Sequence, residues 1–347
     1  MRSRLQREIE DLTERYRQAG YFPSACVRVF NDRETLAQCS VGGISEHAVF
    51  DVASLTKIAT ATQILFLVNR GKLRLEDTVP ALFPEIAVDE YLARRMEGVT
   101  LYRLLTHTST LTAWYPFYSR RGQDFFAVLK YALQHTEPTR GMVYSDLNFM
   151  LLGKLLEKIQ GRSLDACLEQ DLAQPLALGV MTYHPDPLLP IVPSCFGNEI
   201  ERGMCRDRGI SFDGFRPEGT AVRGTANDGN AHYYFGDAAG HAGIFAEAEA
   251  YERLCRFYMR TEDPLLIRAQ QEQETAPGRG IGFERGTAYP HGCGHTGFTG
   301  TGIYFSREKR IGVVSFTNRL YYPQKNEHGT GEFRRALHEA AFALAAE

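Results

Sequence analysis

The sequence lacks the features that mark several large classes of protein. No apolar run approaches the length of a membrane-spanning helix, so we expect no membrane span. Lysine and arginine are scattered along a chain of net charge −3, without the basic stripe of a nucleic-acid-binding protein. The chain also has no internal repeat and no low-complexity segment, which excludes a repeat architecture.

Cysteine is too irregularly spaced to form a disulfide framework or a C-x-x-C metal site. The seven cysteines are residues 26, 39, 167, 195, 205, 255 and 293. An odd count without regular spacing favours reduced thiols, which suits a cytoplasmic protein. The first twenty residues are charged and periodic, unlike a signal peptide. We therefore expect a cytoplasmic protein, or an exported one if its leader is missing from this sequence.

The composition is that of an ordinary globular protein, and 347 residues suffice for a large core and one or two domains. Predicted elements run from a helix and strands, through mostly helices, to strands and a helix. This order predicts an α+β fold: an antiparallel sheet from both ends of the chain, flanked by terminal helices, with an inserted helical lobe. We expect the sheet domain at 1–74 and 232–347, and the lobe at 75–231 with an irregular loop at 183–230.

The individual elements follow from apolar periodicity and from turn residues. Residues 25–31 and 35–41 predict a β-hairpin around a short polar turn. Two more strands are expected at 303–306 and 311–318, joined by a charged turn. The predicted helices cover residues 5–20, 54–70, 99 to near 106–109, 125–135, 148–160, 163–172, 246–260 and 333–344.

The helix predicted to begin at Ser54 carries the first candidate catalytic residues. It is apolar on nearly every face and stops at Gly71, so we expect it to be buried. Lys57, three residues after Ser54, lies on the same face of the helix. Burial disfavours the charge of a lysine and can make it a proton acceptor near neutral pH. A nucleophile, a base and one N–H of an oxyanion hole would then come from one helical turn.

Ser-x-x-Lys is common by chance, and a structural interpretation stays open, in which Ser54 caps the helix and Lys57 extends to water. Two other stretches favour chemistry. Residues 141–148 place a Tyr just before a helix, where a Tyr beside a cation can relay protons. Residues 292–302 are dense in glycine just before a strand, an edge that a substrate backbone can approach closely.

Three motifs in one order carry a resemblance to a known family. Ser54-x-x-Lys57, then Tyr144-Ser145-Asp146, then His295-Thr296-Gly297 resemble the serine β-lactamase and penicillin-binding-protein superfamily. The likeness is to its class C-type branch, which includes D-aminopeptidases, DD-peptidases and esterases. The phrases at 104–109 (LLTHTS) and 239–245 (AGHAGIF) support it. The resemblance runs from about residue 50 to 318 and implies the β-lactamase/DD-peptidase-like fold.

The resemblance also implies roles for particular residues. Ser54 would be the acylated nucleophile, and Lys57 and Tyr144 would share the general-base work. The backbone N–H groups of Ser54 and Phe298 would form the oxyanion hole. The substrate would be bound by Asp146, His295, Thr296 and Gly297. The family needs neither a metal nor a cofactor, and the expected partner is a small-molecule or short-peptide substrate.

Three residues depart from the family pattern. Asp146 stands where β-lactamases of this branch typically carry an Asn that binds the substrate amide. His295 replaces a Lys whose permanent charge lies near the substrate carboxylate. A histidine titrates near pH 6.5, so we expect His295 to bind anionic substrates less well as pH rises from about 5.5 to 8. Thr110 replaces the usual Gly after Thr108-Ser109.

Each of these residues also has a structural interpretation. Tyr144 and His295 could be buried and satisfied, Asp146 could cap the helix expected to begin at Asn148, and His241 is more easily explained by loop structure than by chemistry. His291, Cys293 and His295 alternate, but no carboxylate accompanies them, which disfavours a metal site. The glycines at 278–286 lack the strand–turn–helix context of a dinucleotide site.

The sequence as a whole predicts a serine hydrolase that forms an acyl-enzyme on Ser54. Its substrate would be an amide or ester, and we rank a D-amino-acid peptide or small ester above a β-lactam. Two alternatives stay open: a true class C-type β-lactamase, and a penicillin-binding or sensor module without turnover. The oligomeric state and the choice between water and an amine as acyl acceptor stay open as well.

Overall fold

The computed structural model of the chain describes residues 3–322 and 328–344. Its largest sheet has five antiparallel strands in the order β2-β1-β10-β9-β8. These strands are β1 (Ala25–Asn31), β2 (Thr35–Val41), β8 (Cys293–Thr296), β9 (Gly302–Ser306) and β10 (Ile311–Thr317). β1 pairs with β10 from Ala25 opposite Thr317 to Asn31 opposite Ile311, which confirms that both ends of the chain build one sheet.

The predicted hairpin has the bounds that the sequence indicates. The side chain of Asn31 accepts hydrogen bonds from the backbone N–H groups of Arg33 and Glu34, at 2.7 Å each, and so closes the turn. Alternate residues of β1 then point to opposite faces of the sheet. Val27 and Val29 pack with the terminal helices α1 (Arg4–Gln18) and α13 (Gly331–Leu344), whereas Phe30 belongs to the larger core on the other face.

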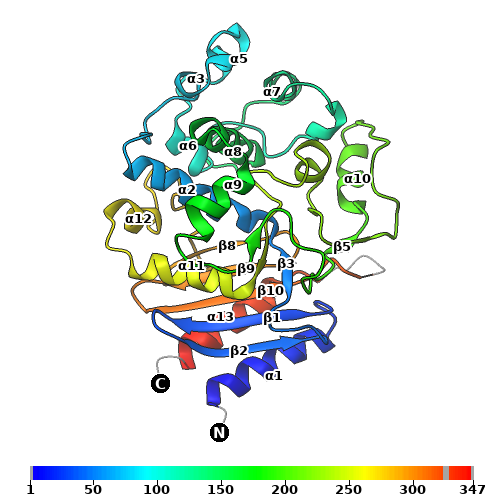
Figure 1. Ribbon diagram of the computed structural model, residues 1–347, viewed down its shortest axis with the longest axis vertical. Helices are drawn as coiled ribbons and strands as arrows, with labels where there is room; N and C mark the ends of the chain where they lie inside the picture. Colours follow the sequence, from blue (N-terminus) through cyan, green and yellow to red (C-terminus); the bar gives the residue numbers. More distant parts are fainter. Residues whose placement is uncertain (1–2, 323–327, 345–347) are drawn as a thin grey trace.

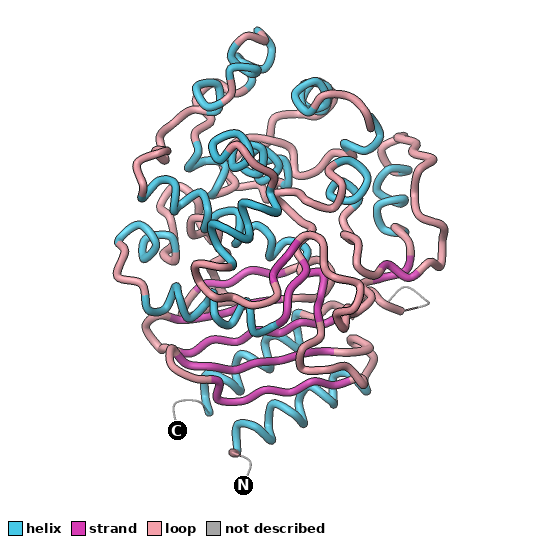
Figure 2. The backbone as a smooth tube through the Cα atoms, viewed as in Figure 1, coloured by secondary structure: helices cyan, strands magenta, loops and turns pink. Residues whose placement is uncertain are grey.

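The two terminal helices lie side by side against the sheet, at the end of the molecule opposite the helical region (Figure 1). Tyr16 of α1 and Phe333 of α13 bring their ring centroids to 5.4 Å. The other face of the sheet is covered by α11 (Ala248–Arg260), whose buried side chains include Tyr251, Leu254 and Tyr258. The large sheet therefore lies between the terminal helices and the other helices, in the lower half of the view of Figure 2.

The remaining helices lie mostly above the sheet in the view of Figure 1. They are α2 (Thr56–Asn69), α3 (Val79–Leu82), α4 (Pro84–Ala87), α5 (Glu90–Arg95), α6 (Leu101–Leu105), α7 (Phe125–Gln134), α8 (Asp146–Gln160), α9 (Leu164–Leu168), α10 (Glu199–Arg206) and α12 (Pro264–Ala269). No helix in the described ranges has the length and apolar character needed to cross a membrane. All seven cysteines are free thiols.

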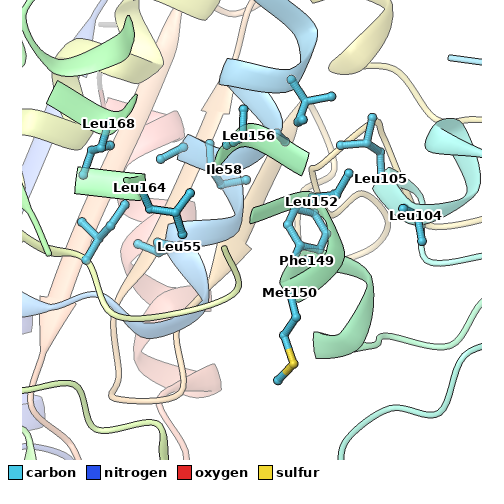
Figure 3. Packing of buried hydrophobic residues seen from close by; sticks show 14 of the residues in the cluster. Leu55, Ile58, Leu104, Leu105, Phe149, Met150, Leu152, Leu156, Leu164 and Leu168 are labelled. Atoms are coloured by element: carbon cyan, nitrogen blue, oxygen red, sulfur yellow. The ribbon is translucent and has the colours of Figure 1, made fainter. Parts of the chain in front are cut away.

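α2 is buried along most of its length and packs against α8, as its apolar sequence predicts. Ile58 of α2 lies beside Leu156 of α8, and Leu55 and Leu152 belong to the same hydrophobic core (Figure 3). A loop also approaches α8 closely: a Cβ on Gly240 would lie 2.2 Å from the carbonyl oxygen of Phe149. Glycine is therefore required at this position. The next residue of the loop, His241, contacts Lys57 in the first turn of α2.

Several elements were not predicted, among them strands of two or three residues. β3 (Val49–Asp51), β4 (Met181–Thr182) and β7 (Phe245–Glu247) form a second small sheet in the order β3-β7-β4. Residues 183–230, expected to be irregular, contain α10 and the two-residue strands β5 (Cys195–Phe196) and β6 (Ala221–Val222). Runs of two or three residues are too short for a period to appear. The division of the chain into two domains stays a prediction.

Candidate active site

Ser54 lies on a tight turn between β3 and α2. The turn is a short 3₁₀ segment, η1 (Ala53–Leu55), that continues into α2. Ala53 has φ of 46°, a left-handed conformation that is uncommon for a residue other than glycine. Its N–H donates to Oδ1 of the buried Asp51 at 2.8 Å, which holds this backbone in place. Ser54 is thereby presented, half-buried, at the start of the helix.

Lys57 is fully buried in the first turn of α2. Three oxygen atoms surround its Nζ: Oγ of Ser54 at 2.9 Å, the carbonyl oxygen of His241 at 3.0 Å, and Oδ1 of Asp146 at 2.8 Å. Burial lowers the pKa of Lys57, but the Asp146 carboxylate, with a smaller contribution from Tyr144, outweighs burial and raises that pKa above its usual value. In the free site Lys57 is therefore charged, because Asp146 is a counter-ion that the effect of burial alone leaves out.

Asp146 is not the helix cap that the sequence suggested. α8 begins at Asp146 itself, and Ser145 occupies the N-cap position without a capping side-chain hydrogen bond. The carboxylate of Asp146 lies instead at the N-terminal end of α8, where the helix dipole favours a negative charge. Its side chain is 17% exposed. Asp146 thus links the start of α8 to Lys57 in the first turn of α2.

Tyr144 lies just before α8, with its ring against the ammonium group of Lys57. The distance from Nζ to the ring centroid is 4.9 Å. The ring also packs on the buried His107, with centroids 4.5 Å apart. The hydroxyl is buried and lies close enough to the side chains of Lys57 and Ser54 for both to lower its pKa. Burial raises the pKa of Tyr144, and Lys57 offsets this only in part, so the group is a phenol at neutral pH.

The end of β8 is fastened directly to the strand that precedes Ser54. Oγ1 of Thr299 donates to the carbonyl oxygen of Asp51 at 2.8 Å, and Oγ1 of Thr301 donates to that of Val52 at 3.0 Å. A Cβ on Gly297 would lie 2.5 Å from the carbonyl oxygen of Val52, so only glycine fits there. The motif that ends in Gly297 and the turn that holds Ser54 therefore form one rim, from which Phe298 projects with 44% of its surface exposed.

A family model described as Beta-lactamase matches residues 9–336 of the chain. Among curated relatives, an N-acetylmuramyl-L-alanine amidase of Bacillus subtilis is 27% identical over 91% of this chain and 81% of its own. A putative D-alanyl-D-alanine carboxypeptidase of Escherichia coli is 26% identical, covering 80% and 71%. The solved structure of EstCE1, a hydrolase with promiscuous acyltransferase activity, has the same fold, with a TM-score of 0.71, 17% identity and coverage of 97% and 98%.

The chain belongs to the Beta-lactamase family. The predicted superfamily, the α+β fold class and the assignment as a serine hydrolase acting on amide or ester bonds are confirmed by the family match and these relatives. The residues assigned to the site are this chain's own matches to the family motifs. Their roles stay predictions, which rest on the contacts of Lys57 with Ser54, Asp146 and Tyr144.

His295 stands where the β-lactamases that the chain resembles carry a lysine, and it is both buried and uncharged. It is 1% exposed, and its Nδ1 lies 2.8 Å from the carbonyl oxygen of Thr296, to which it must donate. Burial lowers the pKa of His295 to about 4, and the nearby Glu284 restores only part of the loss. His295 is therefore neutral between pH 5.5 and 8, and the expected titration across that range is wrong.

A permanent cation near this position comes from a residue that the sequence analysis missed. The guanidinium of Arg279 lies 5.1 Å from the ring centroid of Tyr144 and 3.6 Å from Oε1 of Glu284. Its side chain is 7% exposed. Arg279 belongs to the glycine-rich stretch 278–286, whose glycines predict a strand or turn and not a site. Nothing in its local sequence indicates that the fold brings it next to Tyr144.

The third departure, Thr110, adopts a left-handed backbone conformation, which favours glycine. Its φ is 68°, which is unfavourable for a β-branched residue. Arg95 donates to both Oγ1 and the carbonyl oxygen of Thr110, at 3.1 and 2.9 Å. These bonds hold the strained residue in place, next to the loop of His107 that supports Tyr144.

The irregular segment 183–230 reaches the site through its last residues. The N–H of Asn227 donates to Oδ2 of Asp51 at 2.6 Å, and Asp228 lies 2.9 Å from Nε2 of His241, whose carbonyl oxygen faces Lys57. Behind them, Glu201 of α10 accepts a hydrogen bond from the N–H of Gly229 at 2.7 Å. Within the described residues, no group of three His, Cys, Asp or Glu side chains is arranged to hold a metal ion.

Glu201 supplies a test of this packing through stability. Burial, with the nearby Asp228 carboxylate, raises the pKa of Glu201 from 4.5 to about 8. The unfolded chain releases this proton near pH 4.5 while the folded chain keeps it, so stability falls as pH rises from about 4.5 to 8. Glu201→Gln has no such loss. We expect chemical denaturation to find it more stable than wild type by about 2 kcal/mol at pH 8.5, and no more stable at pH 4.5.

The matched control is Glu199→Gln on the exposed face of the same helix, which should track the wild type at every pH. A constant difference between Glu201→Gln and wild type across this range would mean that Glu201 is ionised in the fold.

Proposed function

We propose that this serine hydrolase forms its acyl-enzyme on Ser54 and cleaves an amide or ester, with a D-amino-acid peptide or a small ester as substrate. The observation that carries the proposal is the distance of 2.9 Å between Oγ of Ser54 and Nζ of a fully buried lysine. A nucleophile within hydrogen-bond reach of a base, which is itself oriented by a third group, is the arrangement that covalent catalysis needs.

The reaction would follow the two steps of acyl transfer. Oγ of Ser54 attacks the carbonyl carbon, and Lys57 and Tyr144 together act as the general base that removes the proton of Ser54. The backbone N–H groups of Ser54 and Phe298 would stabilise the oxyanion, because the hydrogen bonds from Thr299 and Thr301 hold the two segments together. The leaving group departs with a proton, and water then attacks the acyl-enzyme. His295, Thr296 and Gly297 would line the substrate along β8.

Two properties of the site support ranking peptides and esters above β-lactams. His295 is neutral where β-lactamases carry a lysine, and the charge of Asp146 is engaged by Lys57. The relatives named as an amidase and a carboxypeptidase favour an amide bond, and EstCE1 adds acyl transfer as a related reaction. A role as a true β-lactamase, or as a sensor that acylates once, stays open beside this proposal.

A substrate panel tests the proposal. It consists of p-nitrophenyl esters, D-amino-acid amides, a D-alanyl-D-alanine peptide and a chromogenic cephalosporin. We expect many turnovers of an ester or a D-peptide, and kcat/KM for the cephalosporin at least about 100-fold lower, which is roughly 3 kcal/mol of discrimination. A single burst equal to the enzyme concentration would favour a sensor. Fastest turnover of the cephalosporin would favour a β-lactamase.

A further inference from the structure

The surroundings of Lys57 raise a question about where its proton goes. An ammonium group carries three N–H bonds, and three oxygen atoms surround Nζ within 3.0 Å. In this state Ser54 accepts a hydrogen bond from Lys57, so Lys57 cannot accept the proton of Ser54. Lys57 must lose a proton before it can act as a base.

Only one of the three oxygens belongs to a base. The oxygen of His241 is a backbone carbonyl and that of Ser54 is a hydroxyl, whereas Oδ1 of Asp146 belongs to a carboxylate. Tyr144 cannot take the proton either, because burial raises its pKa and keeps it a phenol. Among the described neighbours of Nζ, Asp146 is therefore the one that can receive the proton of Lys57.

We propose, on the basis of the proposed function, that Asp146 accepts the proton of Lys57 as Lys57 accepts that of Ser54. The bond from Oγ of Ser54 to the substrate carbon forms, and the electron pair of the carbonyl moves to its oxygen. One proton moves from Ser54 to Lys57 and one from Lys57 to Asp146. When the bond to the leaving group breaks, Lys57 gives a proton to that group and recovers one from Asp146.

Physical conditions in the site favour this exchange. A substrate that covers the site displaces water from around Asp146, which is 17% exposed in the free protein. Loss of solvent destabilises an ion pair relative to its neutral form, an amine beside a carboxylic acid. An Asn at this position, as in the β-lactamases that the chain resembles, cannot receive a proton. This makes Asp146 a proton-accepting partner of Lys57 rather than a second contact for the substrate amide.

The test measures how fast a fluorophosphonate probe modifies Ser54 at different pH values, followed by intact-protein mass spectrometry. In the wild type the charged pair is ready to react across neutral pH, so the rate constant should change by less than about threefold between pH 6 and 8. In Asp146→Asn, reaction needs a neutral Lys57. For a buried lysine with a pKa of about 7 or more, the rate should then rise at least tenfold over that range.

Two further variants keep the result interpretable. Asp146→Ser also removes the carboxylate and should show the same rise, which covers a failure of Asp146→Asn to fold. Asp124→Asn makes the same change at the start of α7, outside the site, and should leave the profile flat. If Asp146 only binds substrate, both site variants lower the rate by the same factor at every pH, and the inference is overturned. If the wild-type adduct is not on Ser54, the proposed function itself fails.

Discussion

Ser54→Ala is expected to lower kcat/KM for any substrate of this protein by about four to six orders of magnitude. The hydroxyl of Ser54 would be the atom that forms the covalent bond, and alanine offers no substitute. Lys57 and Tyr144 would remain in place without a nucleophile to activate. Loss of a single member of such a unit typically removes nearly all of the acceleration that the unit supplies.

The loss should occur without a loss of structure. The hydroxyl of Ser54 is hydrogen-bonded to Lys57, and the hydrogen bond between Ala53 and Asp51 holds the backbone of the turn. Thermal unfolding of Ser54→Ala should therefore stay near that of the wild type. Ser163→Ala, which removes the exposed cap of α9, is the matched control: it should lose about 1 kcal/mol of stability and keep full activity. Substantial activity in Ser54→Ala would exclude Ser54 as the nucleophile.

Lys57→Arg is expected to lower kcat/KM by about three orders of magnitude or more while keeping the positive charge. An arginine can still pair with Asp146, but it cannot give up a proton at any pH that the fold tolerates. Protons can therefore no longer pass from Ser54 through residue 57 to Asp146. Initial rates from pH 5 to 10 should show no recovery of activity at high pH.

Because Lys57 is fully buried, the larger guanidinium could disturb packing, and thermal unfolding of Lys57→Arg must be measured beside its activity. Lys154→Arg on α8 is the matched control, since Lys154 pairs with Glu157 at the surface and should tolerate the change. Activity of a folded Lys57→Arg above about a tenth of the wild type would mean that Lys57 does not transfer protons.

The parts of the fold that follow from local pattern could be predicted from the sequence. The hairpin of β1 and β2 has alternating residues and an Asn at its turn, and both strands have their predicted bounds. α2 and α8 are long, and a glycine just after each helix marks its end. The strands β3, β4 and β7 have two or three residues each, and their positions depend on contacts with distant segments. No pattern within a few residues records such contacts.

The candidate site shows the same division. Ser54, Lys57 and Tyr144 could be located because each belongs to a motif of fixed spacing, and the fold brings them together. The ionisation states could not be predicted, because they depend on neighbours that are distant in sequence. Asp146 reverses the effect of burial on Lys57, and an apolar surrounding keeps His295 neutral. Arg279 has no local signal, and only the folded chain places it beside Tyr144.

The covalent intermediate on Ser54 is tested most directly by trapping it. A reaction with a p-nitrophenyl ester is quenched with acid during turnover, and the protein is analysed by intact mass and peptide mapping. The account predicts one acyl group per chain, on the peptide that contains Ser54, and no acyl group on Ser54→Ala. An acyl group on any other residue, or continued turnover by Ser54→Ala, would contradict it.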